Sequence, residues 1–173
     1  PSIRAAAIAS LGKLKAPESL PTLKAALFDR IPAVRSVAAF SMGYFEQHQV
    51  LTPLTRALAD SNPGVQAAAV ASLLRVGAPF AVVKDTVEQI LNDQNPAIRS
   101  GAVKALGNGK GREVIAKLLF ALNDPLPRPR IVATRALGRM GDRTLLQVLK
   151  RTLRDTDEAV RVTAAAAIVT MLD

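Results

Sequence analysis

The feature that most constrains the fold is a repeat of about 31 residues that runs through the whole chain. Repeat units begin at positions 1, 32, 63, 96, 127 and 158, and the sixth unit has about half the length of the others. Every unit has alanine at its seventh position and a large aliphatic residue at its eleventh. Agreement at the same positions in six units indicates an array built from one structural unit.

Each unit is predicted to be a hairpin of two helices. Apolar residues at positions 3, 7, 8 and 11 share one face of a helix, and proline usually opens this segment. Glycine at position 12 of four units is expected to end the first helix. Asn62, Asn95 and Asp157 stand just before a first helix, where a side-chain oxygen can cap the first turn. A second apolar series, such as Leu51 and Leu54, predicts the second helix of each unit.

Two helices that each carry one apolar stripe cannot bury those stripes alone, so neighbouring units must stack. The sequence therefore predicts an all-α fold, an α-solenoid of five to six stacked helical hairpins, with residues 1–173 forming a single array. The composition agrees with this prediction, because the 30 alanines and 22 leucines favour closely packed helices.

The repeat resembles the HEAT-like repeat family, in particular its short form first named from phycobiliprotein lyase subunits. The resemblance covers essentially the whole chain. It is clearest in three segments, residues 29–43, 93–107 and 124–138. In the first of them the matching residues are Asp29, Pro32, Val34, Arg35, Ala38 and Gly43. The resemblance is specific for the fold, but a fold does not by itself assign a function.

The resemblance also implies a structural ladder of aspartate and arginine at the turns between repeats. An aspartate precedes an arginine by six residues in four places, which are Asp29 and Arg35, Asp93 and Arg99, Asp124 and Arg130, and Asp155 and Arg161. Because the family uses these residues to link successive repeats, we expect them to be structural rather than ligand contacts. Asp60 faces Gln66, so one rung is expected to be altered. The same repeat has two extra residues and Leu74 in place of glycine, which predicts a local bend around residues 74–85.

The net charge of +9 is spread unevenly along the chain. Residues 1–95 carry nine basic and seven acidic side chains, whereas residues 96–173 carry fourteen basic and seven acidic ones. The resemblance places positions 2, 5, 9 and 13 of a unit on the concave groove of the solenoid. In the fourth and fifth units these positions include Lys104, Arg128, Arg135 and Arg139. Such a patch attracts phosphate or an acidic protein, and the alternative is a face that only makes the protein soluble.

Two of the six aromatic residues fall on the same groove in the second unit, at Phe40 and Tyr44. An exposed aromatic side chain among small residues is typical of a protein-binding anchor. The alternative is that Phe40 packs against a neighbouring helix.

The chain lacks the residues on which much enzymatic and metal-binding chemistry depends. It has no cysteine and a single histidine, which excludes a disulfide framework, a thiolate zinc site and a multi-histidine metal site. His48, expected in a loop near Glu46, has no recognisable nucleophile beside it. The glycine-rich segment 107–112 does not have P-loop spacing, and we expect it to be a turn. These observations predict no enzymatic activity, no metal site and no cofactor.

The longest stretch without charge, residues 61–74, is 14 residues long, short of the roughly 20 residues of a membrane span. No signal-peptide pattern opens the sequence, and we expect a cytoplasmic rather than a secreted location. The sequence opens on a first helix and closes with the strongly apolar segment 158–173, whereas solenoids need polar ends. We therefore expect a segment of a longer array, or another chain that covers the ends.

The sequence is most consistent with a non-catalytic scaffold that binds a macromolecular partner through the concave groove, and a protein is the favoured class of partner. Phe40 and Tyr44 would supply an apolar anchor, and the basic row would engage acidic groups. The alternative is a nucleic-acid-binding module that uses the basic groove of the fourth and fifth repeats. A lesser alternative, taken from the family resemblance, is a bilin lyase subunit or a phycobilisome-related chaperone.

Overall fold

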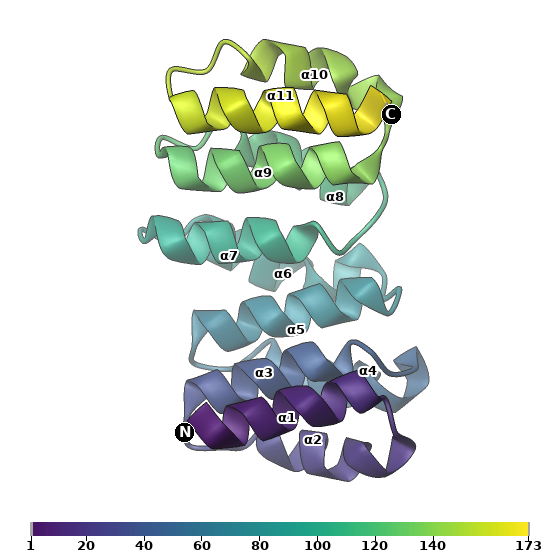
Figure 1. Cartoon of the computed structure of the whole chain (residues 1–173). Coiled ribbons are helices and arrows are strands. Elements are labelled where there is room, and N and C mark those ends of the chain that lie inside the picture. The colour runs from purple at the N-terminus through teal and green to yellow at the C-terminus, as the bar shows by residue number, and fades with distance from the viewer. Residues whose placement is uncertain (1, 173) are drawn as a thin grey trace. The chain divides into compact units, whose positions relative to one another are not determined.

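The computed structural model of the chain describes residues 2–172, and every regular element in that range is a helix (Figure 1). The helices follow one another as hairpins. In two hairpins a short 3₁₀ helix, Pro17–Ser19 or Arg143–Leu145, comes directly before the second helix. The predicted all-α solenoid of stacked hairpins is confirmed, although the expected start at Pro1 lies outside the described residues. The α-helices are α1 (Ser2–Leu14), α2 (Leu20–Ala26), α3 (Pro32–Met42), α4 (Gln47–Ala57), α5 (Pro63–Arg75), α6 (Phe80–Leu91), α7 (Pro96–Leu106), α8 (Arg112–Ala121), α9 (Pro127–Met140), α10 (Leu146–Thr152) and α11 (Glu158–Leu172).

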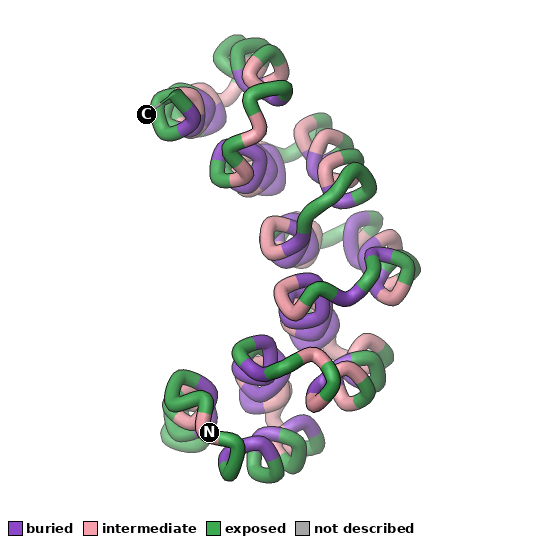
Figure 2. The backbone as a smooth tube through the Cα atoms, turned by 90° about the vertical axis from the view of Figure 1, so that its right-hand side faces the viewer, coloured by how far each residue is buried: buried purple, intermediate pink, exposed green. Residues whose placement is uncertain are grey.

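The chain divides into two compact bodies, an N-terminal body of residues 1–90 and a C-terminal body of residues 91–173. In the N-terminal body α1 packs on α3 and α3 packs on α5, while α2 and α4 pack behind α3 and α5. In the C-terminal body α7, α9 and α11 pack in the same order, with α8 and α10 behind α9 and α11. Each body therefore has a first-helix layer, made of odd-numbered helices, and a second-helix layer, made of even-numbered ones (Figure 2).

The core of each body lies between its two layers. The alanines at the seventh position are fully buried in α3, α5, α7, α9 and α11, and leucines or methionine at the eleventh position are fully buried beside them in α3, α5, α7 and α9. Leu54, Leu118 and Leu149 close the core from the second-helix layer. Alanine is needed at the seventh position because protein interiors are packed as densely as organic crystals and a larger side chain would separate the helices.

The glycine at position 12 ends the first helix in two units, as predicted, because α3 and α7 stop just before Gly43 and Gly107. Helices α1 and α9 continue past Gly12 and Gly138, so the prediction that this glycine ends the first helix was wrong for both. A Cβ atom at Gly43 would lie 2.7 Å from Ser72 Oγ, and one at Gly138 would lie 2.5 Å from Ala167 Cβ. At Gly12, Gly43 and Gly138 the next first helix crosses too closely to leave room for a side chain.

The helix starts follow the predicted capping. Asn62 Oδ1 accepts a hydrogen bond from Gly64 N at 3.0 Å, and Asn95 Oδ1 accepts one from Ala97 N at 2.9 Å. Asp157 Oδ1 likewise accepts one from Val160 N, at 3.1 Å. These side chains satisfy backbone N–H groups that have no partner within the helix.

Candidate functional site

The arginine at the fourth position of a first helix binds the aspartate of the following turn. In the N-terminal body Arg35 Nε donates to Asp60 Oδ2 at 2.7 Å and Arg35 Nη2 donates to Asp60 Oδ1 at 2.8 Å. Arg35 Nη1 also donates to the backbone carbonyl of Asp29 at 2.9 Å. One guanidinium therefore fixes two successive turns, since its planar fork matches a carboxylate in a bidentate pair.

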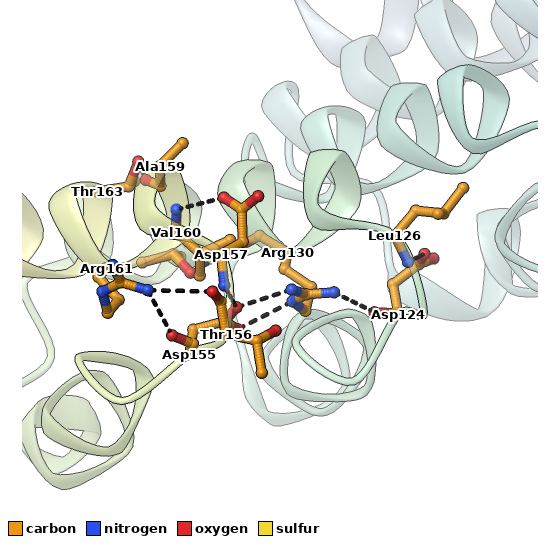
Figure 3. Close-up of polar contacts among 11 residues, drawn as sticks. Asp124, Leu126, Arg130, Asp155, Thr156, Asp157, Ala159, Val160, Arg161 and Thr163 are labelled. Carbon is orange, nitrogen blue, oxygen red and sulfur yellow. Dashed lines mark hydrogen bonds and ion pairs between the residues drawn. The ribbon is translucent and has the colours of Figure 1, made fainter.

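The C-terminal body repeats this arrangement, as Figure 3 shows around Arg130. Arg130 Nη2 donates to Asp155 Oδ1 at 2.7 Å and Arg130 Nη1 donates to the Asp124 carbonyl at 2.9 Å. Arg99 Nε donates to Asp124 Oδ2 at 2.6 Å. Arg161, in the sixth repeat, donates from Nη1 to the Asp155 carbonyl at 3.0 Å.

Asp29, Asp124 and Asp155 thus each pair through the side chain with the arginine 25 residues earlier, and through the carbonyl with the arginine six residues later. This register corrects the expectation that Gln66 would alter the rung of Asp60, because Arg35 engages both Asp60 oxygens. Gln66 Nε2 donates to the Asp60 carbonyl at 2.8 Å, as an arginine would. Its buried Oε1 has no hydrogen-bond partner among the described residues. The altered rung is therefore the next one along the chain, because Gln66 stands in place of an arginine and supplies no cation to the aspartate of the following turn.

The ion pairs lower the pKa values of their carboxyl groups. The hydrogen bonds from Arg35 hold the pKa of Asp60 below its usual range. Arg99 and Arg130 lower the pKa values of Asp124 and Asp155 in the same way. The hydrogen bonds that these carboxyl groups accept from arginine link successive repeats.

The aromatic residues predicted on the groove form a cluster in the N-terminal body. The rings of Phe40 and Tyr44 meet edge to face, with centroids 5.8 Å apart and an angle of 88° between their planes. Phe40 is 40% exposed and Tyr44 is 38% exposed. The Arg75 guanidinium carbon lies 4.4 Å from the Phe40 centroid and 5.0 Å from that of Tyr44, and Lys15 Nζ lies 5.8 Å from the Tyr44 centroid. The cluster is a partly exposed apolar surface bordered by cations.

Sequence reasoning missed Arg75, although the repeat itself offered a signal. Arg75 occupies position 13 of the third repeat, the same position that Tyr44 occupies in the second. Because α3 packs on α5, Arg75 at the end of α5 reaches the ring of Tyr44, which follows the end of α3. The predicted anchor at Phe40 and Tyr44 is therefore an aromatic and cationic surface rather than an isolated aromatic patch.

The predicted basic row lies on two adjacent helices of the C-terminal body. Lys104 is exposed on α7, and Arg128, Arg135 and Arg139 are exposed on α9. None of the four takes part in an ion pair with another described residue. Because α7 and α9 pack side by side, the four residues of the row form one region of uncompensated positive charge.

A groove of about 290 Å³ runs between α9 and α11 beside this row. One wall is formed by Arg135 and Arg139, and the facing wall by apolar and hydroxyl side chains that include Val162, Thr163 and Thr170. The groove thus presents cations on one side and apolar and hydroxyl groups on the other. The aromatic cluster belongs to the N-terminal body.

The two remaining candidates from the sequence are His48 and the glycine-rich segment 107–112. His48 is exposed in the first turn of α4, not in a loop as predicted. The glycine-rich segment forms a turn in which Gly109 N donates to the Leu106 carbonyl, and Gly111, with φ of 98°, precedes α8. Within residues 2–172, no three His, Asp or Glu side chains gather as a metal site requires. No helix in that range is both long enough and apolar enough to cross a membrane.

Several solved structures share this architecture. The complex of CpcE and CpcF of phycocyanin lyase from Nostoc sp. PCC7120 contains a chain 24% identical in sequence, with a TM-score of 0.62 over 88% of this chain and 99% of that one. An engineered protein is 18% identical, with a TM-score of 0.52 over 97% of this chain and 90% of that one. Human deoxyhypusine hydroxylase is 16% identical, with a TM-score of 0.51 over 98% of this chain and 79% of that one. At these identities the similarity establishes the fold alone.

No curated protein sequence matches the chain. The family model described as HEAT repeats matches residues 1–74, 56–126 and 83–170, which together span almost the whole sequence. The repeat of helical hairpins, the buried alanines and the arginine ladder are the physical basis of that match. The chain therefore belongs to the HEAT repeat family.

Proposed function

We propose that this HEAT-repeat chain is a non-catalytic scaffold that binds an acidic protein partner on its first-helix layer. The observation that carries the proposal is the basic row of Lys104, Arg128, Arg135 and Arg139, which lies exposed and without ion pairs among the described residues. Arginine is enriched at the centres of protein interfaces because its guanidinium binds carboxylates in a bidentate manner.

The groove between α9 and α11 favours a protein over a nucleic acid. Its facing wall carries Val162 and Ala166, which suit an apolar side chain that lies beside acidic residues. Single-stranded nucleic acids are held largely by stacking of bases on aromatic rings. No aromatic side chain lines this groove among the described residues, so phosphate attraction would act there without stacking.

The aromatic cluster of the N-terminal body supports the same function. Exposed Phe40 and Tyr44, with Arg75 beside them, have the residue types that dominate the binding energy of protein interfaces. The similar phycocyanin lyase chain was solved in a complex of CpcE and CpcF. A partnership with a second protein is therefore one that a chain of this fold can form.

The test compares two fluorescent probes, a short peptide of alternating Glu and Leu residues and a single-stranded oligonucleotide, by anisotropy at about 50 and 200 mM salt. We expect the peptide to bind more tightly than the oligonucleotide at the higher salt concentration. The variant Arg128→Glu/Arg135→Glu/Arg139→Glu should lose peptide binding. The matched control Lys150→Glu/Arg151→Glu/Arg154→Glu changes the net charge equally on and after α10 and should retain it.

Tighter binding of the oligonucleotide, lost in the first variant and kept in the control, would instead favour the nucleic-acid module. Equal weakening in both variants would mean that the net charge, and not the basic row, attracts the probes.

A further inference from the structure

A second cavity lies on the second-helix layer of the N-terminal body, between α2 and α4. Its volume is about 620 Å³, within the range of roughly 300–1,000 Å³ that is typical of small-molecule sites. Eleven residues line it, whereas a standard protein interface uses about 20–30 residues on each side. The size of this outer cavity therefore fits a small ligand better than a protein surface.

The lining of the outer cavity combines an aromatic and aliphatic floor with cations at its edge. Leu27 is buried, and Phe28, which follows the end of α2, is 69% exposed although it is a large apolar side chain. Lys24 and Arg56 are exposed at the same cavity. Aromatic rings prefer offset or edge-to-face contact with another ring, so an exposed Phe28 offers a contact for a planar apolar ligand.

The acidic group in the lining does not cancel the positive charge. Asp60 is the single carboxylate among the lining residues, and both of its oxygens are bound by Arg35. The net charge that a ligand meets therefore comes from Lys24 and Arg56. A carboxylate is the complementary group because charge-assisted hydrogen bonds from ammonium and guanidinium are about twice as strong as neutral ones.

The C-terminal body provides an internal comparison, since the same repeat positions form a smaller cavity of about 400 Å³ between α8 and α10. Each lining residue there lies 95 positions after its counterpart. Arg151 stands where Arg56 does, but Leu119 replaces Lys24 and Asn123 replaces Phe28. Arg154 stands where Ala59 does, so both cavities have two cations in their lining. The hollow itself is thus a result of stacking, whereas the aromatic ring of Phe28 and the position of the second cation, at Lys24, are particular to the outer cavity.

We propose that the outer cavity binds a small aromatic carboxylate. The ring of the ligand lies against Phe28, Leu27 and Pro53, and its carboxylate accepts hydrogen bonds from Lys24 and Arg56. This site lies on the second-helix layer of the N-terminal body, the basic row belongs to the C-terminal body, and the proposal does not depend on the proposed scaffold function.

The test uses the full chain and the single histidine as a reporter, because His48 lines the outer cavity. The imidazole C–H resonances of His48 are followed by proton NMR at fixed pH while 2-naphthoate or its neutral analogue 2-naphthamide is added. We expect a saturable shift with naphthoate, with a Kd of about 1 mM or lower, and binding of the amide at least about tenfold weaker.

Three variants locate the site. Lys24→Ala/Arg56→Ala should weaken naphthoate to the level of the amide, and Phe28→Ala should weaken both ligands. Arg151→Ala, the counterpart of Arg56 in the other body, should leave the titration unchanged. Circular dichroism of each variant should match that of the wild type, which checks that these exposed substitutions preserve the helices. The absence of a saturable His48 shift, equal affinity for acid and amide, or a loss in Arg151→Ala equal to that in the double variant would overturn the proposal.

Discussion

Arg35 and Asp60 form a bidentate ion pair across 25 residues of sequence, with Arg35 Nε 2.7 Å from Asp60 Oδ2. Both side chains are mostly buried, and the same guanidinium also holds the carbonyl of the preceding turn. The pair is the unit of which the ladder is built, because Arg99 with Asp124 and Arg130 with Asp155 repeat its geometry.

Removing one cation of the ladder should destabilise the N-terminal body. In Arg35→Ala, Asp60 keeps its backbone hydrogen bond to Asn62 but loses its cation, and the Asp29 carbonyl loses a donor. Hydrogen bonds to charged groups contribute about 1.5–3 kcal/mol, and we expect a loss of stability of that order in urea unfolding followed by circular dichroism. Arg4→Ala is the matched control, because the Arg4 side chain is 49% exposed in its pair with Asp29. A loss in Arg4→Ala as large as that in Arg35→Ala would contradict the prediction.

Acid should weaken the fold through the same carboxylates. The pKa values of Asp60, Asp124 and Asp155 are lowered in the folded protein. Such groups stabilise the fold fully above their unfolded pKa of about 3.9, and this stabilisation is lost as the pH falls through the lower folded pKa. Unfolding midpoints in urea should therefore stay level from neutral pH to about pH 5 and fall below about pH 4. The fall should be shallower in Arg35→Ala, and an identical pH profile would exclude this pair as its source.

The close contact at Gly43 predicts an unusual response to alanine. In Gly43→Ala the new Cβ would lie 2.7 Å from Ser72 Oγ and 3.0 Å from Ser72 Cα, so α3 and α5 must separate. Overpacking of this kind costs about 1–3 kcal/mol, although alanine is the better helix former. Gly64→Ala, in the first turn of α5, meets only the Asn62 side chain and should be neutral or stabilising. Thermal unfolding of the two variants provides the comparison, and a stabilised Gly43→Ala would exclude the contact.

The aromatic cluster should respond to loss of Arg75 in a way that tyrosine fluorescence detects. The chain has one tyrosine and no tryptophan, so Tyr44 is the single fluorophore of its kind. Arg75→Ala removes the guanidinium 5.0 Å from the ring centroid and should increase quenching of Tyr44 by neutral acrylamide. The cation–π contact contributes about 0.5–1 kcal/mol. Arg56→Ala, on the second-helix layer, should not change the quenching, and equal quenching in wild type and Arg75→Ala would contradict the geometry.

The repeat allowed the helices and their pairing to be predicted from sequence, because periodic alanine and leucine leave few alternative packings. Glycine was misread, since Gly12 and Gly138 share a sequence position with a common helix terminator. Their role depends on how closely Ser41 and Ala167 of the following first helices approach, and no local pattern encodes that distance.

The ladder residues were correctly grouped by type, but their register was not determined by spacing alone. A six-residue interval suggested that Asp60 would face Gln66, whereas the carboxylate points back to Arg35. The outer cavity was missed for a similar reason. Its lining comes from two hairpins, and Lys24, Phe28 and Arg56 share no motif in one dimension.

The one-to-one pairing of arginine and aspartate in the ladder's ion pairs has a consequence for the surface charge of the chain. Four arginines and four aspartates neutralise one another in the observed pairs, so the ladder contributes nothing to the net charge of +9. The excess charge resides on side chains outside these pairs, such as Arg128 and Arg135. Stacking and surface charge therefore depend on different side chains, so exposed substitutions can change the sign of the net charge while the ladder is left intact.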